Sequence, residues 1–286
     1  MAEIKDASMS PHAHILSNCF VNVPFDRLKS DMLKVVLDNR IRPEIGLTGN
    51  VLYDEPASEF SRIAKILRSE GLACTLHAPF QDLVPGAFDP EILNVSRNKL
   101  RKAFALLDVF EPQAIVCHLN FEPDKHASKE EQWFAHSLET WRELLLMAED
   151  SGTPMMLENT YEKTPDQLLK MLQSLDSPNA RFCFDVGHVM AFAKNSWQDW
   201  LPTLEPWLGQ LHLHDNDGIT DAHMGVGEGV FNFEELFRYL AEQQLEPLIT
   251  LEPHQEEGLW QGLANIDRLG LFATLLKPQR SSQLSN

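Results

Sequence analysis

The chain alternates short, mostly apolar runs with longer segments in which apolar residues recur at positions i, i+3, i+4 and i+7. Short apolar runs are typical of buried strands, and the longer spacing is typical of amphipathic helices. The predicted strands cover residues 13–23, 42–47, 73–77, 113–118, 154–158, 180–185, 209–214 and 248–252. The predicted helices cover residues 24–39, 55–69, 89–110, 129–150, 164–175, 197–207, 233–244 and 258–276. The pattern therefore predicts eight successive strand–helix units.

Turn residues support these boundaries. Glu70-Gly71 falls where a helix should end before a strand, and Thr164-Pro165 begins a helix with a capping residue followed by proline. Eight such units in one chain predict an α/β fold, a closed (β/α)₈ TIM barrel, as a single domain over residues 1–278. A polar tail over 279–286 should fray. A doubly wound open sheet is the alternative fold, but the glycine-rich first turn of a nucleotide-binding sheet is missing.

Composition narrows the class of protein. The 286 residues are 43% hydrophobic and 23% charged, which excludes a disordered chain, a collagen-like repeat and a coiled coil. With 24 basic and 42 acidic residues the net charge is −18, which disfavours duplex nucleic acid and anionic membranes as partners. The four cysteines form no CxxC pair, so we expect reduced core thiols and a cytoplasmic protein without a membrane segment. The sequence does not decide whether the chain forms a homo-oligomer.

Polar residues follow six consecutive predicted strands at the point where each one ends. These residues are His77, His118, Glu158, Asp185 with His188, His212 with His214, and Glu252 with His254. The loop after the seventh strand adds Asp221 and His223. In a barrel, the carboxyl ends of all strands meet at one mouth, so we expect these side chains to converge there.

Taken alone, a histidine or carboxylate at a strand end is commonly a hydrogen-bonded rim residue or a helix cap. Several carboxylates at one mouth, however, lose solvation and repel one another, at a cost on the order of several kcal/mol. A divalent cation removes that cost. Because neutral imidazoles and carboxylates together suit Zn²⁺ or Mn²⁺, we expect a divalent metal as cofactor, with one to three ions per chain.

Four motifs carry a family resemblance. They are Leu76-His77-Ala78-Pro79-Phe80, Leu157-Glu158-Asn159-Thr160, Phe184-Asp185-Val186-Gly187-His188 and His212-Leu213-His214-Asp215. Together with Asp221 and His223 they resemble the xylose isomerase-like TIM-barrel superfamily, which holds sugar isomerases and epimerases and the class II apurinic/apyrimidinic endonucleases. The resemblance runs from the third strand to the eighth.

The epimerase branch implies one metal ion, bound by two glutamates, one aspartate and one histidine. The matching residues here are Glu158, Asp185, His212 and Glu252. The resemblance implies that the two glutamates are also the catalytic acid and base, which move a proton beside the substrate carbonyl through an enediolate that the metal stabilises. His188 matches a histidine that binds the substrate.

The endonuclease branch implies three zinc ions and nine ligands. The matching residues are His77, His118, Glu158, Asp185, His188, His212, Asp221, His223 and Glu252. In this branch Glu158 would bridge two ions, and His188, Asp221 and His223 would hold the third. Such a cluster activates water and clamps a phosphodiester.

Both ligand sets are complete, so charge decides the preference. The net charge of −18 argues against a function in DNA repair, because an acidic chain repels DNA phosphates. We therefore expect a small carbohydrate or sugar phosphate as the substrate. Asp217-Gly218-Ile219 stands where ketohexose epimerases are expected to offer an arginine, which argues against a free ketohexose. We expect a metal-dependent isomerase or epimerase; a multinuclear zinc phosphodiesterase and a catalytically silent barrel are the alternatives. Further residues expected to line the substrate pocket are Phe80, Asn120, His214 and His254.

Overall fold

A computed structural model describes residues 10–275 of the chain. Eight parallel strands close into one barrel in the order β1 to β8, which confirms the predicted (β/α)₈ fold and single domain. The strands are β1 (Phe20–Pro24), β2 (Pro43–Gly46), β3 (Thr75–His77), β4 (Ile115–His118), β5 (Met155–Glu158), β6 (Ala180–Asp185), β7 (Leu208–Leu213) and β8 (Leu248–Leu251).

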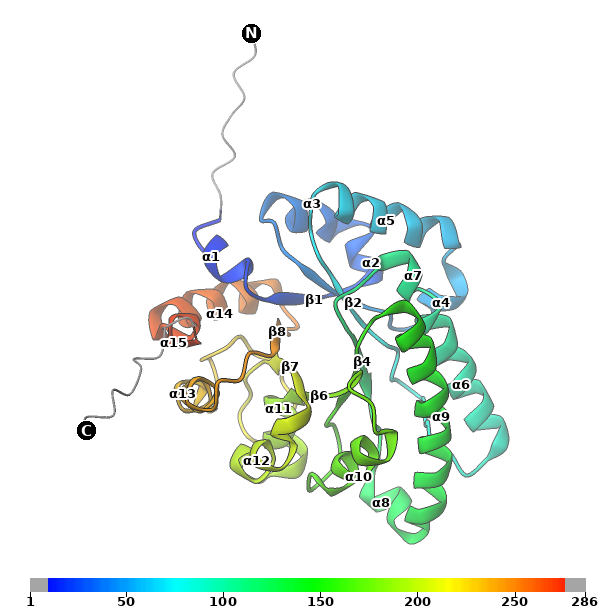
Figure 1. Cartoon of the computed structure of the whole chain (residues 1–286). Coiled ribbons are helices and arrows are strands. Elements are labelled where there is room, and N and C mark those ends of the chain that lie inside the picture. The colour runs from blue at the N-terminus through cyan, green and yellow to red at the C-terminus, as the bar shows by residue number, and fades with distance from the viewer. Residues whose placement is uncertain (1–9, 276–286) are drawn as a thin grey trace, which may run out of the picture.

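Helices surround the strands as an outer ring (Figure 1). The α-helices are α1 (Ala13–Leu16), α2 (Phe25–Leu28), α3 (Asp31–Asp38), α4 (Val51–Asp54), α5 (Ala57–Ser69), α6 (Pro90–Phe104), α7 (Leu107–Phe110), α8 (Pro123–His126), α9 (Glu130–Ser151), α10 (Asp166–Leu175), α11 (Val186–His188), α12 (Leu201–Leu204), α13 (Phe233–Gln243), α14 (Glu256–Leu269) and α15 (Leu271–Leu275). The 3₁₀ and π segments are η1 (Ala127–Lys129), η2 (Val189–Ala193), η3 (Trp197–Asp199) and η4 (Glu205–Trp207). In residues 10–275 no helix is both long enough and apolar enough to cross a bilayer.

Several sequence-based boundaries are wrong: the predicted helices 89–110, 197–207 and 258–276 are each divided into shorter segments, and two further differences lie near the N-terminus. The first predicted strand, 13–23, begins as the helix α1 and becomes a strand only at Phe20. A short apolar run fits a helix turn and a strand equally well, so periodicity alone cannot separate them. The predicted helix 24–39 divides into α2 and α3, because the backbone at Ser30 leaves helical geometry (φ −125°, ψ −104°). The predicted tail 279–286 lies outside the described residues.

The side chains that point into the barrel show where the site lies. Most buried apolar side chains pack between strands and helices, while Ala114, Val116, Met156 and Cys183 form a separate small core inside the barrel. Side chains alternate between the two faces of a strand, so the residues two positions further along β4, β5 and β6 also point inward. Those residues are His118, Glu158 and Asp185. All four cysteines are buried and free, as predicted.

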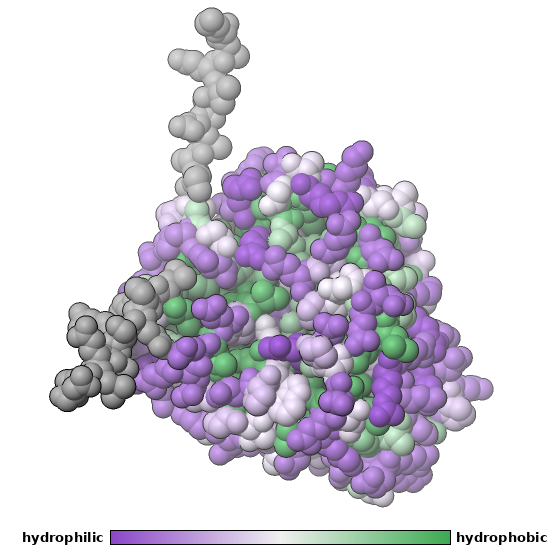
Figure 2. Space-filling model, viewed as in Figure 1, coloured by the Kyte–Doolittle hydropathy of each residue, from purple (hydrophilic) through white to green (hydrophobic). Residues whose placement is uncertain are grey.

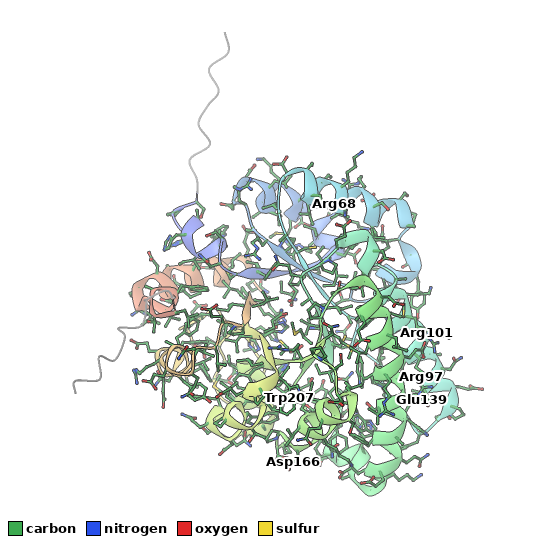
Figure 3. The ribbon with its side chains drawn as sticks, in the orientation of Figure 1. Arg68, Arg97, Arg101, Glu139, Asp166 and Trp207 are labelled. Atoms are coloured by element: carbon green, nitrogen blue, oxygen red, sulfur yellow. The ribbon has the colours of Figure 1, made fainter. Side chains whose placement is uncertain are left out.

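Charged side chains occupy the outer helices. The face seen in Figure 2 is mostly hydrophilic, with apolar patches between the charged residues. Figure 3 places Arg97 and Arg101 of α6 beside Glu139 of α9, far from the barrel axis. Arg97 donates to Glu139 at 2.9 Å, and Arg101 binds Glu143 through two nitrogens. These arginines therefore pair with α9 and do not form a free basic surface.

Candidate metal centre

Closure of the barrel brings the nine predicted ligands together at the carboxyl ends of the strands. His77, His118, Glu158 and Asp185 are the last residues of β3, β4, β5 and β6. The other five are His188 in α11, His212 in β7, Asp221 and His223 in the loop between β7 and α13, and Glu252 directly after β8. Seven of these side chains are almost inaccessible to solvent, whereas Asp221 and His223 keep 24% and 12% of their side-chain surface.

The Glu158 carboxylate divides its two oxygens between two groups of histidines. Its Oε2 lies 3.2 Å from His77 Nε2 and 3.1 Å from His118 Nε2. Its Oε1 lies 3.3 Å from His188 Nδ1 and 3.4 Å from His212 Nδ1. This is the arrangement of a carboxylate that can bridge two cations.

His77, His118 and Glu158 form a first group of candidate ligands. A second group, the buried quartet, consists of Glu158, Asp185, His212 and Glu252. One ligand atom from each of the four lies within 4.8 Å of the others. His212 Nδ1 is at the centre, 3.3 Å from Glu252 Oε2 and 4.0 Å from Asp185 Oδ2. Two of its atoms, Glu158 Oε1 and His212 Nδ1, are buried and have no hydrogen-bond partner among the described residues. Buried polar atoms without partners are costly, so a cation between them fits this group.

A third group forms around Asp221, whose Oδ2 lies 3.2 Å from His223 Nε2 and 3.5 Å from His188 Nε2. Asp215 anchors the loop that carries Asp221, because its carboxylate accepts the N–H groups of Gly229 and Phe231 at 2.9 and 3.1 Å. The loop is thereby folded back over the barrel mouth. His223, with φ 45°, lies in the left-handed region at the point where the loop turns.

Backbone carbonyls orient three of the histidines. The Nδ1 atoms of His77, His188 and His223 lie 2.9 Å from the carbonyl oxygens of Ala78, Asn159 and Glu252, respectively. In the tautomer that donates Nδ1–H to these carbonyls, the Nε2 lone pair points into the site. Metal-binding histidines are commonly oriented in this way, so the residues present fit divalent metal ions.

The carboxylates and imidazoles strongly shift one another's protonation. Burial raises the pKa of Glu158, but the imidazoles of His118 and His212 outweigh it and hold that pKa well below its usual range. Burial lowers the pKa of His223, but Asp221 and Glu252 outweigh burial and raise it to about 9. In the metal-free protein, a proton on His223 thus balances part of the carboxylate charge.

Metal binding is expected to strengthen as the pH rises. The pKa of His223 is raised, so its proton stabilises the metal-free fold at low pH and is lost as the pH passes about 9. A metal ion bound by His223 must displace that proton, so the apparent affinity of this group for Zn²⁺ should rise by about tenfold per pH unit for each proton displaced. Calorimetry in buffers of different ionisation enthalpy counts the released protons. A pH-independent affinity with no proton release would contradict this prediction.

The four further residues predicted to line the pocket have different surroundings. Phe80 stacks on His118 with ring centres 4.2 Å apart, and the exposed His254 stacks on His223 at 3.9 Å. The Asn120 amide donates to the carbonyl of Leu83 at 3.2 Å, so it holds the loop after β3. The Nε2 atom of His214 lies 3.1 and 3.2 Å from the two oxygens of Asp185, which places this imidazole behind a predicted ligand.

The family model described as "Xylose isomerase-like TIM barrel" matches residues 42–269, which is well over half of the chain. The chain belongs to this family. An uncharacterized protein of Methanocaldococcus jannaschii, MJ1311, is 27% identical over 184 residues, which cover 62% of this chain and 63% of that protein. The chain thus spans less than two thirds of that relative's length.

Solved structures of other barrels share the fold. A D-tagatose 3-epimerase-like protein has a TM-score of 0.76 and 21% identity, and the match covers 88% of this chain and 97% of that chain. The TTHB071 protein from Thermus thermophilus, in a crystal soaked with ZnCl₂, has a TM-score of 0.73 and 22% identity over the same shares. At these identities the likeness establishes the barrel and leaves the activity to be argued from the site.

Sequence reasoning missed two polar residues inside this family barrel, the buried Glu44 and the half-buried Asn22. Glu44 of β2 lies 3.1 Å from His212 Nε2, and Asn22 of β1 donates to Glu252 Oε1 at 3.1 Å. Both residues lie inside their strands, whereas the candidates predicted from the sequence lie at strand ends or in the loops that follow them. The available signal was a single acidic residue within Pro43-Glu44-Ile45-Gly46, a segment that is otherwise without charge.

Gly187 makes room for His214. A Cβ at this position would overlap the imidazole ring of His214. Gly187→Ala is therefore expected to lower the free energy of unfolding by about 1–3 kcal/mol and to move His214 away from Asp185. Gly46→Ala is the control, since its Cβ would meet nothing closer than 3.5 Å. Equal urea midpoints for the two variants would refute the prediction.

Proposed function

We propose that the protein is a divalent-metal-dependent isomerase or epimerase of a small sugar or sugar phosphate. The buried quartet carries this proposal. Glu158 ends β5 and Glu252 follows β8, and both approach the same atom, His212 Nδ1, at 3.4 Å for Glu158 and 3.3 Å for Glu252. The likeness to a D-tagatose 3-epimerase-like structure supports the same class of reaction.

In this proposal, Glu158 and Glu252 move the proton. Burial raises the pKa of each glutamate, but neighbouring imidazoles outweigh it and keep both below their usual range, so both are ionised at neutral pH and able to accept a proton. One carboxylate removes a proton from the carbon beside the substrate carbonyl and becomes a carboxylic acid. The other, after taking a proton from solvent, delivers it to the opposite side of that carbon and becomes a carboxylate again. Asn22 holds the Glu252 carboxylate in place through its Oε1. A bound divalent ion would supply Lewis-acid stabilisation of the negative charge that develops on the substrate oxygens.

The burial of the site supports a small substrate. Glu158, Asp185 and His212 are fully buried at the bottom of the barrel mouth. A rigid DNA duplex cannot reach such a site unless a nucleotide is turned out of the double helix or the loops at the barrel mouth open. The net charge of −18 also repels the DNA phosphates. A monosaccharide or its phosphate is of a size that enters a barrel mouth.

Solvent-deuterium incorporation tests this proposal. The protein is incubated in D₂O with a panel of ketoses and ketose phosphates, with Mn²⁺, Co²⁺ or Zn²⁺ added after removal of bound metal. We expect deuterium at the carbon beside the carbonyl of at least one sugar, and none in the presence of excess chelator. Cleavage of a phosphodiester with no exchange into any sugar would overturn the proposed function.

A second candidate function is hydrolysis by a multinuclear zinc centre. The bridging arrangement of Glu158 favours it, because its two oxygens face two different groups of histidines. The third group, around Asp221, would bind one more ion. In this case the cluster would activate water and hold a small phosphodiester by charge. Elemental analysis of protein purified without chelators separates the two candidates: about one ion per chain supports the first, and two or three zinc ions support the second.

A further inference from the structure

Glu44 is a fully buried carboxylate inside the barrel, below the candidate metal centre. It lies in the middle of β2 and has no solvent-exposed surface. Its Oε2 accepts hydrogen bonds from Thr75 Oγ1 at 2.9 Å, Gln210 Nε2 at 2.6 Å and Thr250 Oγ1 at 2.9 Å. Four strands, β2, β3, β7 and β8, thus contribute to one polar layer across the barrel.

This polar layer stabilises the barrel less than apolar side chains in the same positions would. A buried carboxylate loses its hydration, and neutral donors compensate that loss only in part. Inward-facing positions of such barrels are ordinarily occupied by bulky apolar residues, which would pack here without this cost. The presence of Glu44 is therefore better explained by what it contacts than by a contribution to stability.

The second oxygen of Glu44 faces a predicted metal ligand. Oε1 is buried and has no hydrogen-bond partner among the described residues, and the ring nitrogen beside it, at 3.1 Å, is His212 Nε2. The opposite edge of the same ring presents Nδ1 to Glu158 and Glu252. His212 therefore lies between Glu44 and the other three residues of the buried quartet.

Two tautomers of His212 compete. If Nε2 carries the proton, it can donate to Glu44, and the Nδ1 lone pair is left for a cation. If Nδ1 carries the proton, Nε2 can accept from the Gln210 amide, which lies 3.3 Å away, and Nδ1 cannot bind a metal. The amide nitrogen of Gln210 is already bound by Glu44 and Thr250, at 2.6 and 3.0 Å.

We propose that Glu44 is a positioning residue that accepts the Nε2–H of His212 and so directs the Nδ1 lone pair to the metal ion. A carboxylate is a stronger acceptor for an imidazole N–H than a neutral group, and it also increases the basicity of the ligand nitrogen. This inference rests on the metal site of the proposed function. It holds for either candidate reaction, because His212 is a predicted ligand in both.

The test replaces Glu44 with glutamine, which keeps the size and removes the charge. Zn²⁺ affinity is measured by competition with a chromophoric chelator, and we expect Glu44→Gln to bind Zn²⁺ about 10- to 100-fold more weakly than the wild type. Thr75→Val is the matched control: it removes one donor to Oε2, leaves Oε1 in place, and should change the affinity by less than about threefold. In the ¹⁵N spectrum of the zinc-loaded wild type, we expect the His212 proton on Nε2.

The outcomes separate this inference from the proposed function. A wild type that binds no Zn²⁺ overturns the metal site itself. Equal Zn²⁺ affinities of the wild type and Glu44→Gln overturn the role of Glu44 alone. So does a wild type in which the His212 proton lies on Nδ1. If Glu44→Gln does not fold, Glu44→Asp keeps the charge but withdraws the carboxylate by one methylene, and the same loss of affinity is expected. The tautomer is read from the wild type in either case.

Discussion

Glu158→Gln is expected to lower turnover by on the order of 10³-fold or more, whichever reaction the protein catalyses. The carboxylate contacts four imidazoles through both of its oxygens and belongs to two of the ligand groups. Glutamine keeps the shape but has no negative charge, and its amide group would direct N–H donors at nitrogen atoms that should bind metal. Metal content by elemental analysis should fall together with the rate.

Glu143→Gln is the control for this substitution. Glu143 lies on α9 and pairs with Arg101 of α6 on the outside of the barrel, so its loss should leave turnover and metal content unchanged. Circular dichroism of both variants checks that the fold is intact. Near-normal rates with full metal content in Glu158→Gln would remove this residue from the mechanism.

His223→Ala is expected to separate the two candidate functions. The Nε2 atom of His223 faces Asp221 in the third group, and His223 does not belong to the buried quartet. Under the proposed function, sugar exchange should therefore stay within about threefold of the wild type. Under the hydrolytic alternative, the variant should lose one bound zinc ion per chain and about 10²-fold or more in hydrolysis rate. Both activities and the metal content are measured on the same preparation.

His14→Ala is the matched control, because His14 is an exposed histidine that pairs with Asp267 away from the barrel mouth. It should leave both activities and the metal content unchanged. A His223→Ala variant that keeps its full complement of metal would show that Asp221 and His223 do not form a metal site.

The barrel itself could be predicted because each strand and each helix carries its own hydrophobic period. The same reasoning failed where local signals are ambiguous: residues 13–19 are apolar enough for a strand, but Ala13–Leu16 form a helical turn. The break at Ser30 was also missed, because this residue is neither proline nor glycine and the helical spacing of apolar residues continues across it. Boundaries of this kind depend on tertiary packing rather than on propensity.

The candidate ligands could be predicted because chemistry in such barrels lies at the carboxyl ends of strands. Glu44 could not be found in this way, because it lies in the middle of a strand and its meaning depends on β7, more than 160 residues further along the chain. That the gathered residues bind metal, and which metal, stays a prediction.

The sequence by itself determined the class of fold and the set of polar residues at the barrel mouth, because both follow from local periodicity and from strand ends. Only the tertiary structure decided how those residues are grouped. It divided the oxygens of Glu158 between two sets of histidines, placed Glu44 behind His212, and turned three imidazoles toward the centre through backbone carbonyls. Contacts between strands that are distant in the chain arise when the barrel closes, and no local pattern encodes their distances.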